Sequence, residues 1–342
     1  MRGRSASAGP RIWALIGAHA GDNDQVIALA EALKLPFEIK RLTFNAWRHL
    51  GPRLLRTSLS SLTEVSRQMI LSEAPPDLTI SAGHRTVAVV RALRERSKGR
   101  TRSVHVGFPR VSPGHFDLVI ATEQYPIPDH PNLLRIPFAL TRVATQAPDS
   151  ADQAWLQALP GSRSLLIIGG PTLFWNLDEP ALLQRLASMI DEAGESGGSV
   201  LVTTSPRTPA PLRQEIAASL ERSNVPSVLT EPGKAPSLAA LLRASDTILV
   251  TADSVSMVSD AIWAGKAVAL LPVRKSRRGK IAFALNDALR PGQRLYPQDL
   301  RYFWRALGAV GISDRMSEPR ASTKGLLQIV LKRVRPIIKV PG

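Results

Sequence analysis

A strand, a helix and a second strand follow one another in residues 164–204, which read SLLIIGGPTLFWNLDEPALLQRLASMIDEAGESGGSVLVTT. Residues 164–168 and 199–203 are short apolar runs, and residues 179–193 repeat apolar side chains at helical spacing. Two strands that are connected through a helix lie parallel in the sheet, because a parallel connection needs a long crossover. This stretch therefore predicts a parallel sheet covered by helices.

The same alternation continues on both sides of this stretch. Further strands are expected at residues 12–17, 37–42, 77–81, 103–106, 117–121, 225–229, 247–251 and 267–271, with 132–136 as a candidate for another. Further helices are expected at residues 22–33, 85–96, 211–222, 237–243 and 254–264. Residues 137–160 contain Pro148 and several polar side chains, and they separate two series of strands. We therefore expect an α/β protein with two doubly wound domains facing a cleft.

The expected domains cover residues 1–145 and 146–310, followed by a basic C-terminal helical segment at 311–342. The 342 residues carry a formal net charge of +16, and residues 273–342 contain 16 Lys or Arg against 4 Asp or Glu. A basic surface attracts anionic lipid or nucleic acid. Nucleic-acid sites favour interleaved aromatic side chains, and the chain has only 3 Tyr and 8 Phe. We therefore expect an anionic membrane surface as a partner and no nucleic acid, with a solvated basic face as the alternative.

The sequence has no apolar run approaching the roughly 18 residues of a membrane-spanning helix. Arg2, Arg4 and Arg11 lie near an apolar run at residues 12–18, which imitates a short signal peptide but also fits a first buried strand. Residues 324–339 mix aliphatic and basic side chains, which fits a helix on an anionic membrane or a final helix packed on the fold. We expect a cytoplasmic protein. A more specific hypothesis is that it is attached peripherally to the inner membrane. The absence of cysteine excludes disulfides, iron–sulfur clusters and a cysteine nucleophile.

Loops that follow the strands are the candidate sites, because ligands of doubly wound sheets bind beyond the carboxyl ends of the strands. Residues 17–25 follow the first strand and carry His19, which can accept a proton near neutral pH, and Asp22, which can cap the next helix. Gly83 and Arg85 follow the third expected strand and fit an anion at the start of a helix. Plain structural turns are the alternative for both loops.

The second expected domain has three such loops. Their candidate substrate-binding residues are Gly169, Gly170, Thr203, Thr204, Ser205, Arg207, Asp253, Ser254, Ser256 and Asp260. Paired glycines allow a diphosphate to approach the backbone, and hydroxyl and guanidinium groups donate to phosphate or sugar oxygens. Ser254 and Ser256 at a helix start would form a phosphate site, and Asp260 one turn later would accept from a ribose diol. Asp253 would repel phosphate unless it bonds a hydroxyl or caps the helix, and capping alone is the alternative for the whole loop.

At these residues the sequence resembles the bacterial branch of the mitochondrial-fission ELM (elongated mitochondria) family. The matching segments, in the same order, are PDLTISAG (76–83), IGGP (168–171), LVTTSPRTP (201–209) and VTADSVSM (250–257). The resemblance covers about residues 11–275. That family in turn is similar to glycosyltransferases of the GT-B type, which consist of two Rossmann-like domains.

The resemblance implies that the C-terminal domain binds a nucleotide-diphosphate sugar and that the N-terminal domain binds the acceptor. It places His19 in the role of the base and Asp260 near the ribose. The residues that it places around the diphosphate are Gly169, Gly170, Thr204, Ser205, Arg207, Ser254 and Ser256. GT-B enzymes need no metal, and we expect neither a metal nor another cofactor here.

We therefore expect a metal-independent glycosyltransferase that acts on a lipid-linked or cell-envelope glycan acceptor. The alternative is a non-catalytic, membrane-associated adaptor, because plant members of the family are implicated in recruiting fission machinery to mitochondria. The two hydroxyl-rich loops favour a ligand-binding protein, although polar residues at helix starts also have structural uses. The sugar, the nucleotide and the acceptor stay open at this level.

Overall fold

The computed structural model describes residues 9–143, 145–146, 150–231, 233–320 and 322–338. The chain divides into two compact units. Unit 1 comprises the chain up to Arg142 together with the residues from Lys324 onward, and unit 2 comprises Val143–Thr323. The boundary expected from the sequence lies at residue 145, with residues 311–342 as a separate segment, whereas the final helix belongs to unit 1.

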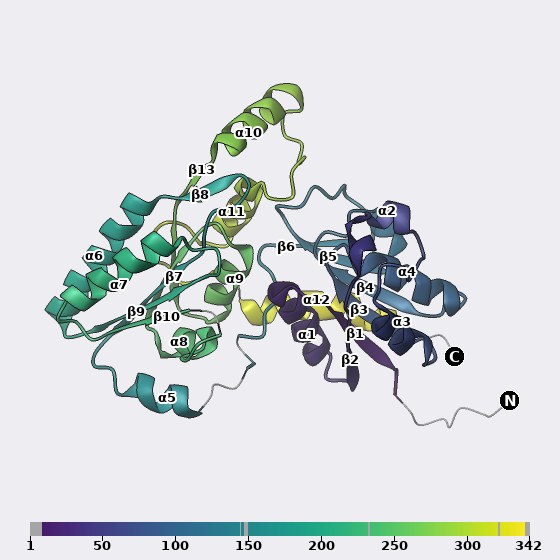
Figure 1. Cartoon of the computed structure of the whole chain (residues 1–342), viewed down its shortest axis with the longest axis horizontal. Helices are drawn as coiled ribbons and strands as arrows, with labels where there is room; N and C mark the ends of the chain where they lie inside the picture. The colour runs from purple at the N-terminus through teal and green to yellow at the C-terminus, as the bar shows by residue number, and fades with distance from the viewer. Residues whose placement is uncertain (1–8, 144, 147–149, 232, 321, 339–342) are drawn as a thin grey trace. The chain divides into compact units, whose positions relative to one another are not determined.

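Unit 1 is built on a six-stranded parallel sheet with the strand order β2-β1-β3-β4-β5-β6 (Figure 1). Its strands are β1 (Ile12–Ile16), β2 (Phe37–Arg41), β3 (Leu78–Ala82), β4 (Arg102–Val106), β5 (Leu118–Thr122) and β6 (Leu133–Ile136). Every strand expected before residue 137 is present, and the candidate at 132–136 is the edge strand β6. Strands β1, β3 and β5 are buried along their whole length, as in sheets that are covered on both faces.

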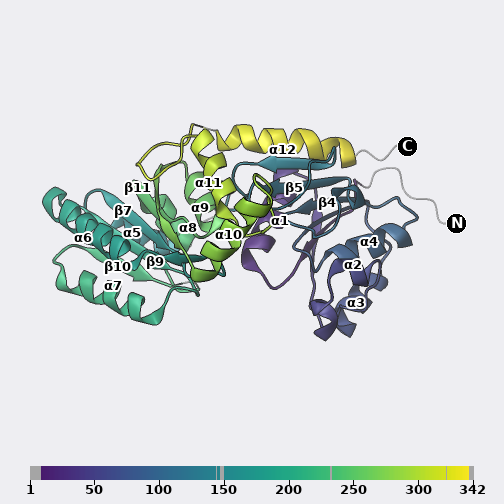
Figure 2. The same cartoon turned by 90° about the horizontal axis from the view of Figure 1, so that it is seen from above.

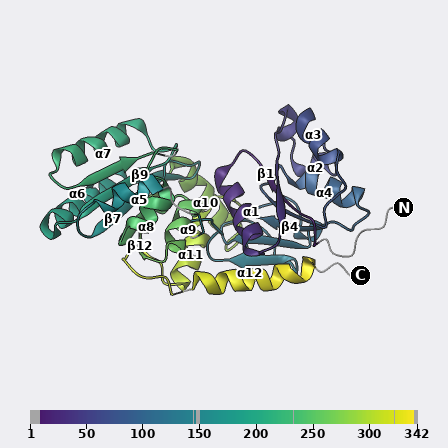
Figure 3. The same cartoon turned by 90° about the horizontal axis from the view of Figure 1, so that it is seen from below.

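Helices cover both faces of this sheet. They are α1 (Ala20–Ala32), α2 (Pro52–Leu55), α3 (Glu64–Leu71), α4 (Val87–Arg96) and α12 (Thr323–Ile338), with 3₁₀ turns at Ala46–His49 and Pro113–His115. Helices α2, α3 and α4 lie on one face and α12 lies on the other (Figures 2 and 3). On the first face, Val90 of α4 and Ile70 of α3 belong to the same core as Trp13 of β1. The doubly wound fold expected for this part of the chain is confirmed.

Helix α12 uses its apolar side for packing. Leu326, Val330 and Val334 are buried, and the Arg333 guanidinium donates 2.8 Å to the Pro131 carbonyl oxygen of the same unit. Residues 324–339 are expected to form either a helix on an anionic membrane or a final helix packed on the fold, and the described part of this segment forms the packed helix. None of the helices in the described residues is both long enough and apolar enough to cross a bilayer.

Unit 2 is built on a five-stranded parallel sheet with the strand order β10-β9-β7-β11-β12. Its strands are β7 (Arg163–Ile168), β9 (Ser199–Thr204), β10 (Ser227–Thr230), β11 (Thr247–Thr251) and β12 (Ala267–Leu271). Its helices are α5 (Ser150–Gln157), α6 (Glu179–Ser196), α7 (Ala210–Arg222), α8 (Leu238–Ala244), α9 (Val255–Trp263), α10 (Arg277–Leu289) and α11 (Leu300–Ala309). Leu186 of α6 and Ile216 of α7 share a core with Leu166 and Val202 of the sheet. The second doubly wound expectation is thus also confirmed.

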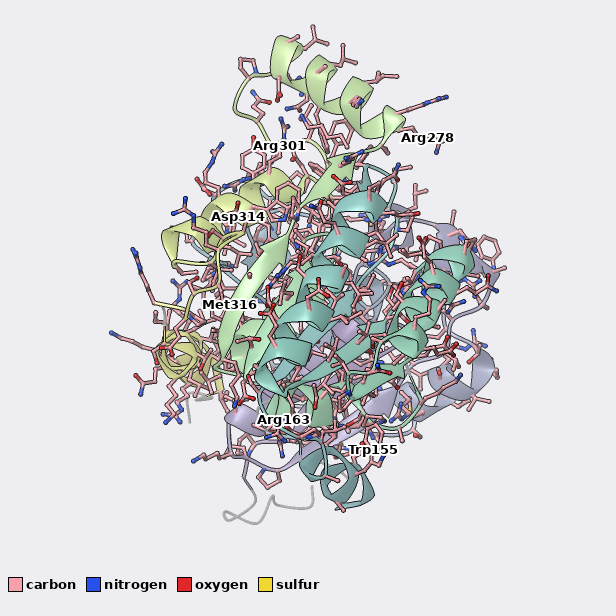
Figure 4. All side chains as sticks on the ribbon, turned by 90° about the vertical axis from the view of Figure 1, so that its left-hand side faces the viewer. Trp155, Arg163, Arg278, Arg301, Asp314 and Met316 are labelled. Atoms are coloured by element: carbon pink, nitrogen blue, oxygen red, sulfur yellow. The ribbon has the colours of Figure 1, made fainter. Side chains whose placement is uncertain are left out.

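A small two-stranded antiparallel sheet was not predicted. It pairs β8 (Trp175–Leu177) with β13 (Val273–Lys275) and leads into α10. Both strands have only three residues, which is too short for a periodic pattern to show. Phe174, Trp175, Phe283 and Leu300 form a separate apolar cluster beside it, which joins α10 to α11 (Figure 4 shows these elements with Arg278 and Arg301 labelled).

Candidate functional site

The loops that follow β1 and β3 leave the same edge of the unit 1 sheet, because these strands are parallel neighbours. The strand order turns back at β1, and ligands bind at such a switch point in open parallel sheets. Asn23 closes the first loop: its side-chain nitrogen donates to the Gly17 carbonyl and its oxygen accepts from the Gly17 amide, both at 2.8 Å. His19 lies directly before α1 and is exposed.

Asp22 of α1 lies against Gly83 of the second loop. Gly83 has a φ of +74°, and a methyl group there would lie 2.9 Å from Asp22 Oδ2. Burial raises the pKa of Asp22, and the positive charges of His19 and Arg85 oppose that rise. The nitrogen Nε of Arg85 is buried and has no hydrogen-bond partner among the described residues. The four residues singled out in this domain therefore form one polar cluster, with a carboxylate able to accept a proton.

Two further members of this cluster were missed in the sequence. Burial, together with the positive charges of Arg110 and Arg85, lowers the pKa of His84 to about 4, so His84 is neutral at pH 7. Burial and the negative charge of Asp22 raise the pKa of Tyr125 to about 12. His84 lies between Gly83 and Arg85, which are both candidate site residues, and this position in the sequence was enough to indicate it as a third candidate. Tyr125 follows β5, which β4 separates from β3 in the sheet, by three residues and carried no local signal.

A buried histidine lies on the adjacent strand. His105 of β4 is fully buried, and its Nδ1 lies 3.0 Å from the Ser81 hydroxyl of β3. Burial lowers the pKa of His105 to about 3. His105 is therefore a neutral core residue at physiological pH, beneath the loop that carries His84.

In unit 2, Asp253 joins three loops at the carboxyl edge of the sheet. Its side chain is fully buried, and its carboxylate accepts hydrogen bonds from the Gly170 amide at 2.9 Å and the Thr251 hydroxyl at 2.6 Å. The Arg207 guanidinium donates to the same carboxylate at 2.9 Å. The Thr251 hydroxyl in turn accepts from the Gly169 amide at 2.7 Å. Asp253 thus bonds a hydroxyl, which is one of the two orientations anticipated for it.

The two glycines after β7 are required by the protein's own side chains. A methyl group on Gly169 would overlap both carboxylate oxygens of Asp253, and one on Gly170 would overlap the Arg207 backbone. From the sequence, this space is expected to hold an approaching diphosphate. The structure fills it with Asp253 and Arg207, and these two residues neutralise each other in charge.

A cavity of about 870 Å³ opens beside this junction, wholly within unit 2. Its lining comes from the ends of β9 and β10 and the starts of α8 and α9: Thr203, Thr204, Ser205, Pro206, Arg207, Glu231, Gly233, Lys234, Ala235, Pro236, Ser237, Leu238, Ser254, Ser256 and Met257, together with Gln146 and Asp152. Six of the ten residues predicted for this domain line it. Gly169, Gly170, Asp253 and Asp260 are not among the lining residues.

One of the lining residues has a buried hydroxyl without a partner among the described residues. Thr204 is 1% exposed, and its Oγ1 makes no hydrogen bond with any described residue. Ser205, by contrast, is bonded to Thr208, which donates to the Gly169 carbonyl and fixes the loop. A buried hydroxyl without a partner costs free energy, and a polar ligand in the cavity would supply the missing bond.

The start of α9 supplies further donors to the cavity. Ser254 precedes the helix without capping it through its side chain, and its hydroxyl lies 3.3 Å from that of Ser256. The first turn of α9 contains no acidic residue, so its backbone N–H groups keep their positive potential. Both serines lie where the sequence analysis placed them, at a helix start that lines a cavity.

The loop after β10 was missed. Lys234 lines the cavity from this loop and pairs with Glu231 at 2.9 Å. Ser237 caps α8 through its hydroxyl, and its amide donates 2.8 Å to Asp152. This loop has no glycine-rich or hydroxyl-rich signature, so only the order of strands in the sheet brings it to the cavity. Among the described residues, no group of three or more His, Asp and Glu side chains has the arrangement of a metal site.

Comparison with solved structures supports the fold. The chain superposes on the UDP-GlcNAc 2-epimerase from Methanocaldococcus jannaschii with a TM-score of 0.52 and 12% identity, covering 95% of this chain and 99% of that one. It superposes on a putative UDP-N-acetylglucosamine 2-epimerase from Listeria monocytogenes with a TM-score of 0.56 and 13% identity, covering 98% of each chain. Likeness at this level of identity establishes a fold of the GT-B type with Rossmann-like domains.

Comparison of sequences identifies the family. The chain is 25% identical over 241 residues to "Mitochondrial fission protein ELM1" from Arabidopsis thaliana, covering 63% of this chain. It spans about half of that relative, 56% of its length. The family model described as "Mitochondrial fission ELM1" matches residues 20–300, which include the cavity of unit 2 and the polar cluster of unit 1 except His19. This chain therefore belongs to the mitochondrial fission ELM1 family.

Proposed function

We propose that the cavity of unit 2 binds a nucleotide-diphosphate sugar and that the protein is a metal-independent glycosyltransferase. The unpartnered hydroxyl of Thr204 carries this proposal, because Thr204 lines a cavity that is also lined by an uncapped helix start. A polar ligand with several oxygen acceptors fits both features. The solved structures of similar fold are named for enzymes of UDP-GlcNAc, which supports a nucleotide sugar as that ligand.

The diphosphate is assigned to the start of α9. Ser254 and Ser256 donate through their hydroxyls, and the backbone N–H groups of the first turn stabilise the negative charge. Arg207 shares its charge with Asp253, so it contributes a partly neutralised guanidinium rather than a free cation. Asp253, Gly169 and Gly170 hold the cavity loops in place through the hydrogen bonds and close contacts of the Asp253 carboxylate. No metal is needed in this arrangement, because helix and hydroxyl donors take the place of a cation.

The reaction transfers one sugar from phosphate oxygen to an acceptor hydroxyl. A base accepts the hydroxyl proton, the hydroxyl oxygen forms the bond to the anomeric carbon, and the bond to the diphosphate breaks. The electron pair of that bond leaves with the nucleoside diphosphate, whose charge the α9 donors stabilise. Asp22 and His19 are the candidate bases. The raised pKa of Asp22 brings its basicity closer to what this step requires.

The acceptor is proposed to be a lipid-linked or cell-envelope glycan. The high net charge of +16 supports work at an anionic membrane surface. In this proposal the protein is cytoplasmic and peripheral on the inner membrane, and nucleic acid is not a partner.

A non-catalytic adaptor is the second candidate. It is supported by the family's name and by that of the Arabidopsis relative, which both refer to mitochondrial fission. An enzyme that binds a sugar donor needs an open cavity lined by polar groups, whereas a non-catalytic adaptor does not. Nucleotide binding therefore separates the two candidates.

The deciding experiment is calorimetric titration of the full chain with UDP, GDP and UDP-GlcNAc in the presence of a metal chelator. We expect one nucleoside diphosphate to bind and to raise the melting temperature. Ser256→Asp places a negative charge at the start of α9 and is expected to weaken binding at least tenfold without loss of folding. Ser219→Asp on the exposed side of α7 is the matched control and should bind normally. Absence of binding by a folded wild-type protein would leave the adaptor as the better candidate.

A further inference from the structure

Helix α10 carries an apolar stripe that the described residues leave uncovered. Ile281, Leu285 and Leu289 are 70%, 54% and 70% exposed. They are four residues apart, so they follow one another along one face of the helix. The other face is anchored: Phe283 is fully buried between Phe174 and Trp175. Exposed aliphatic side chains in a continuous row point to an interaction site rather than to chance.

The same segment is strongly cationic. Residues 273–294 contain seven Lys or Arg and a single acidic residue, Asp287. In the part of the chain that the structure describes, five of these cations form no ion pair: Lys275, which lies over the Phe283 ring, and Arg277, Arg278, Lys280 and Arg290. Figure 4 shows Arg278 at the first turn of α10, on the outside of unit 2.

The one carboxylate of α10 is held by the protein. Asp287 accepts from Arg301 of α11 at 2.7 Å, and the same guanidinium bonds the buried Asp299 at 2.7 Å. Arg301 therefore ties α10 to α11 and shares its single positive charge between Asp287 and Asp299. Ser276 caps the helix by accepting from the Gly279 amide at 3.0 Å. The helix is thus formed and oriented before any partner arrives.

We propose that α10 is a membrane-docking helix that lies flat on an anionic lipid surface. The stripe of Ile281, Leu285 and Leu289 enters the boundary between headgroups and acyl chains, and the unpaired cations meet lipid phosphates. An apolar face beside cationic side chains is the pattern of interfacial helices. Nucleic acid would gain nothing from three aliphatic side chains. A second copy of the chain would bring like charges together at the stripe, which is unfavourable.

This surface differs from the one that the sequence suggested. Residues 324–339 have a similar composition, but α12 buries Leu326, Val330 and Val334 against its own unit. Helix α10 keeps the corresponding residues exposed. The docking surface is also independent of the nucleotide site, so membrane binding and nucleotide binding are expected to fail separately.

The test uses the full chain and sedimentation with vesicles. Phosphatidylcholine vesicles containing about one-third phosphatidylglycerol should bind the protein. The affinity for pure phosphatidylcholine vesicles should be lower by roughly a factor of ten or more, because the negative headgroup charge is absent. Leu285→Ser combined with Leu289→Ser should weaken binding roughly a hundredfold, since two aliphatic side chains no longer enter the lipid. The matched control is Leu54→Ser combined with Val65→Ser in unit 1, where both side chains are at least as exposed. Melting temperature confirms that each variant is folded.

A second measurement locates the helix directly. The chain has no cysteine, so Leu285→Cys accepts a single environment-sensitive dye. Its emission should shift to the blue with anionic vesicles, and the same dye at Val65→Cys should not respond. Binding that survives the double serine variant, or a dye at 285 that does not respond, would overturn the proposal. So would dimerisation that the double serine variant abolishes, because the stripe would then be covered by a second copy.

Discussion

The Arg207 guanidinium lies 2.9 Å from the carboxylate of Asp253, whose side chain is fully buried. Arg207 follows β9 and Asp253 follows β11, and these strands lie on opposite sides of β7. The pair therefore crosses the central strand of the sheet and holds together the loops that border the cavity. Its main consequence is structural, because Asp253 receives three donors and has no accessible surface left for a ligand.

Asp253→Ala is expected to lower the free energy of unfolding by about 2–4 kcal/mol, because it leaves the buried Gly170 amide and Thr251 hydroxyl without their partner. Urea unfolding followed by circular dichroism measures the change. Glu192→Ala removes an exposed ion pair with Arg185 and should cost less than about 1 kcal/mol. Equal losses in both variants would contradict the role given to Asp253.

Gly169→Ala is expected to destabilise unit 2 by roughly 1–3 kcal/mol, because its methyl group has no space beside the Asp253 carboxylate. Gly308→Ala in α11 has open space around its methyl group and should stabilise by about 0.5–1 kcal/mol through helix propensity. Thermal unfolding of the two variants compares them. A stable Gly169→Ala protein would mean that the loop has room for a ligand after all.

Thr204→Val is expected to leave the free energy of unfolding unchanged or to raise it by about 1 kcal/mol, because it replaces a buried hydroxyl without a partner by a methyl group of the same shape. The same change should weaken nucleotide binding by roughly tenfold. Chemical unfolding and calorimetry measure the two effects. A clear loss of stability would show that the hydroxyl is satisfied in the free protein, and would remove the main support for the donor site.

His105 is expected to make the protein sensitive to acid. Its pKa is about 3 when folded and 6.5 when free, so the unfolded chain binds the extra proton first as the pH falls. Between pH 7 and pH 5 this linkage should cost about 2 kcal/mol of stability. Urea unfolding at both pH values tests it, with His105→Gln as the variant that should lose part of the dependence. An unchanged pH dependence in that variant would show that His105 titrates normally.

Asp22→Asn should change the pH dependence in the opposite direction. Because burial raises the pKa of Asp22 in the folded protein, the stability that this carboxyl contributes in acid is lost as pH rises through the folded value. The variant cannot ionise, so its stability relative to the wild type should increase with pH. Transfer activity, once a donor is known, should disappear in Asp22→Asn if Asp22 is the base and persist if His19 is.

The strand–helix alternation was readable from the sequence because it is local. Most strands of the two large sheets are runs of buried apolar residues, such as β1, β3 and β9, and most of the covering helices show an apolar side within a few turns. Neighbouring residues therefore suffice to predict both sheets. The hydroxyl-rich loop after β9 and the start of α9 were also found, because strand ends and helix starts have composition signals of their own. Thr204, Ser254 and Ser256, which these signals indicate in the sequence, all line the cavity of unit 2.

The tertiary structure alone decided what each of these residues does. Gly170 and Asp253 are 83 positions apart, and only the pairing of β11 with β7 brings them together. Burial gives Asp22 and His84 their shifted pKa values, and burial depends on every element packed around them. Residues 277–289 and 323–338 are similar basic, amphipathic segments, yet one stripe is exposed and the other is covered. Composition cannot separate them, because the difference lies in which neighbours the fold places against each face.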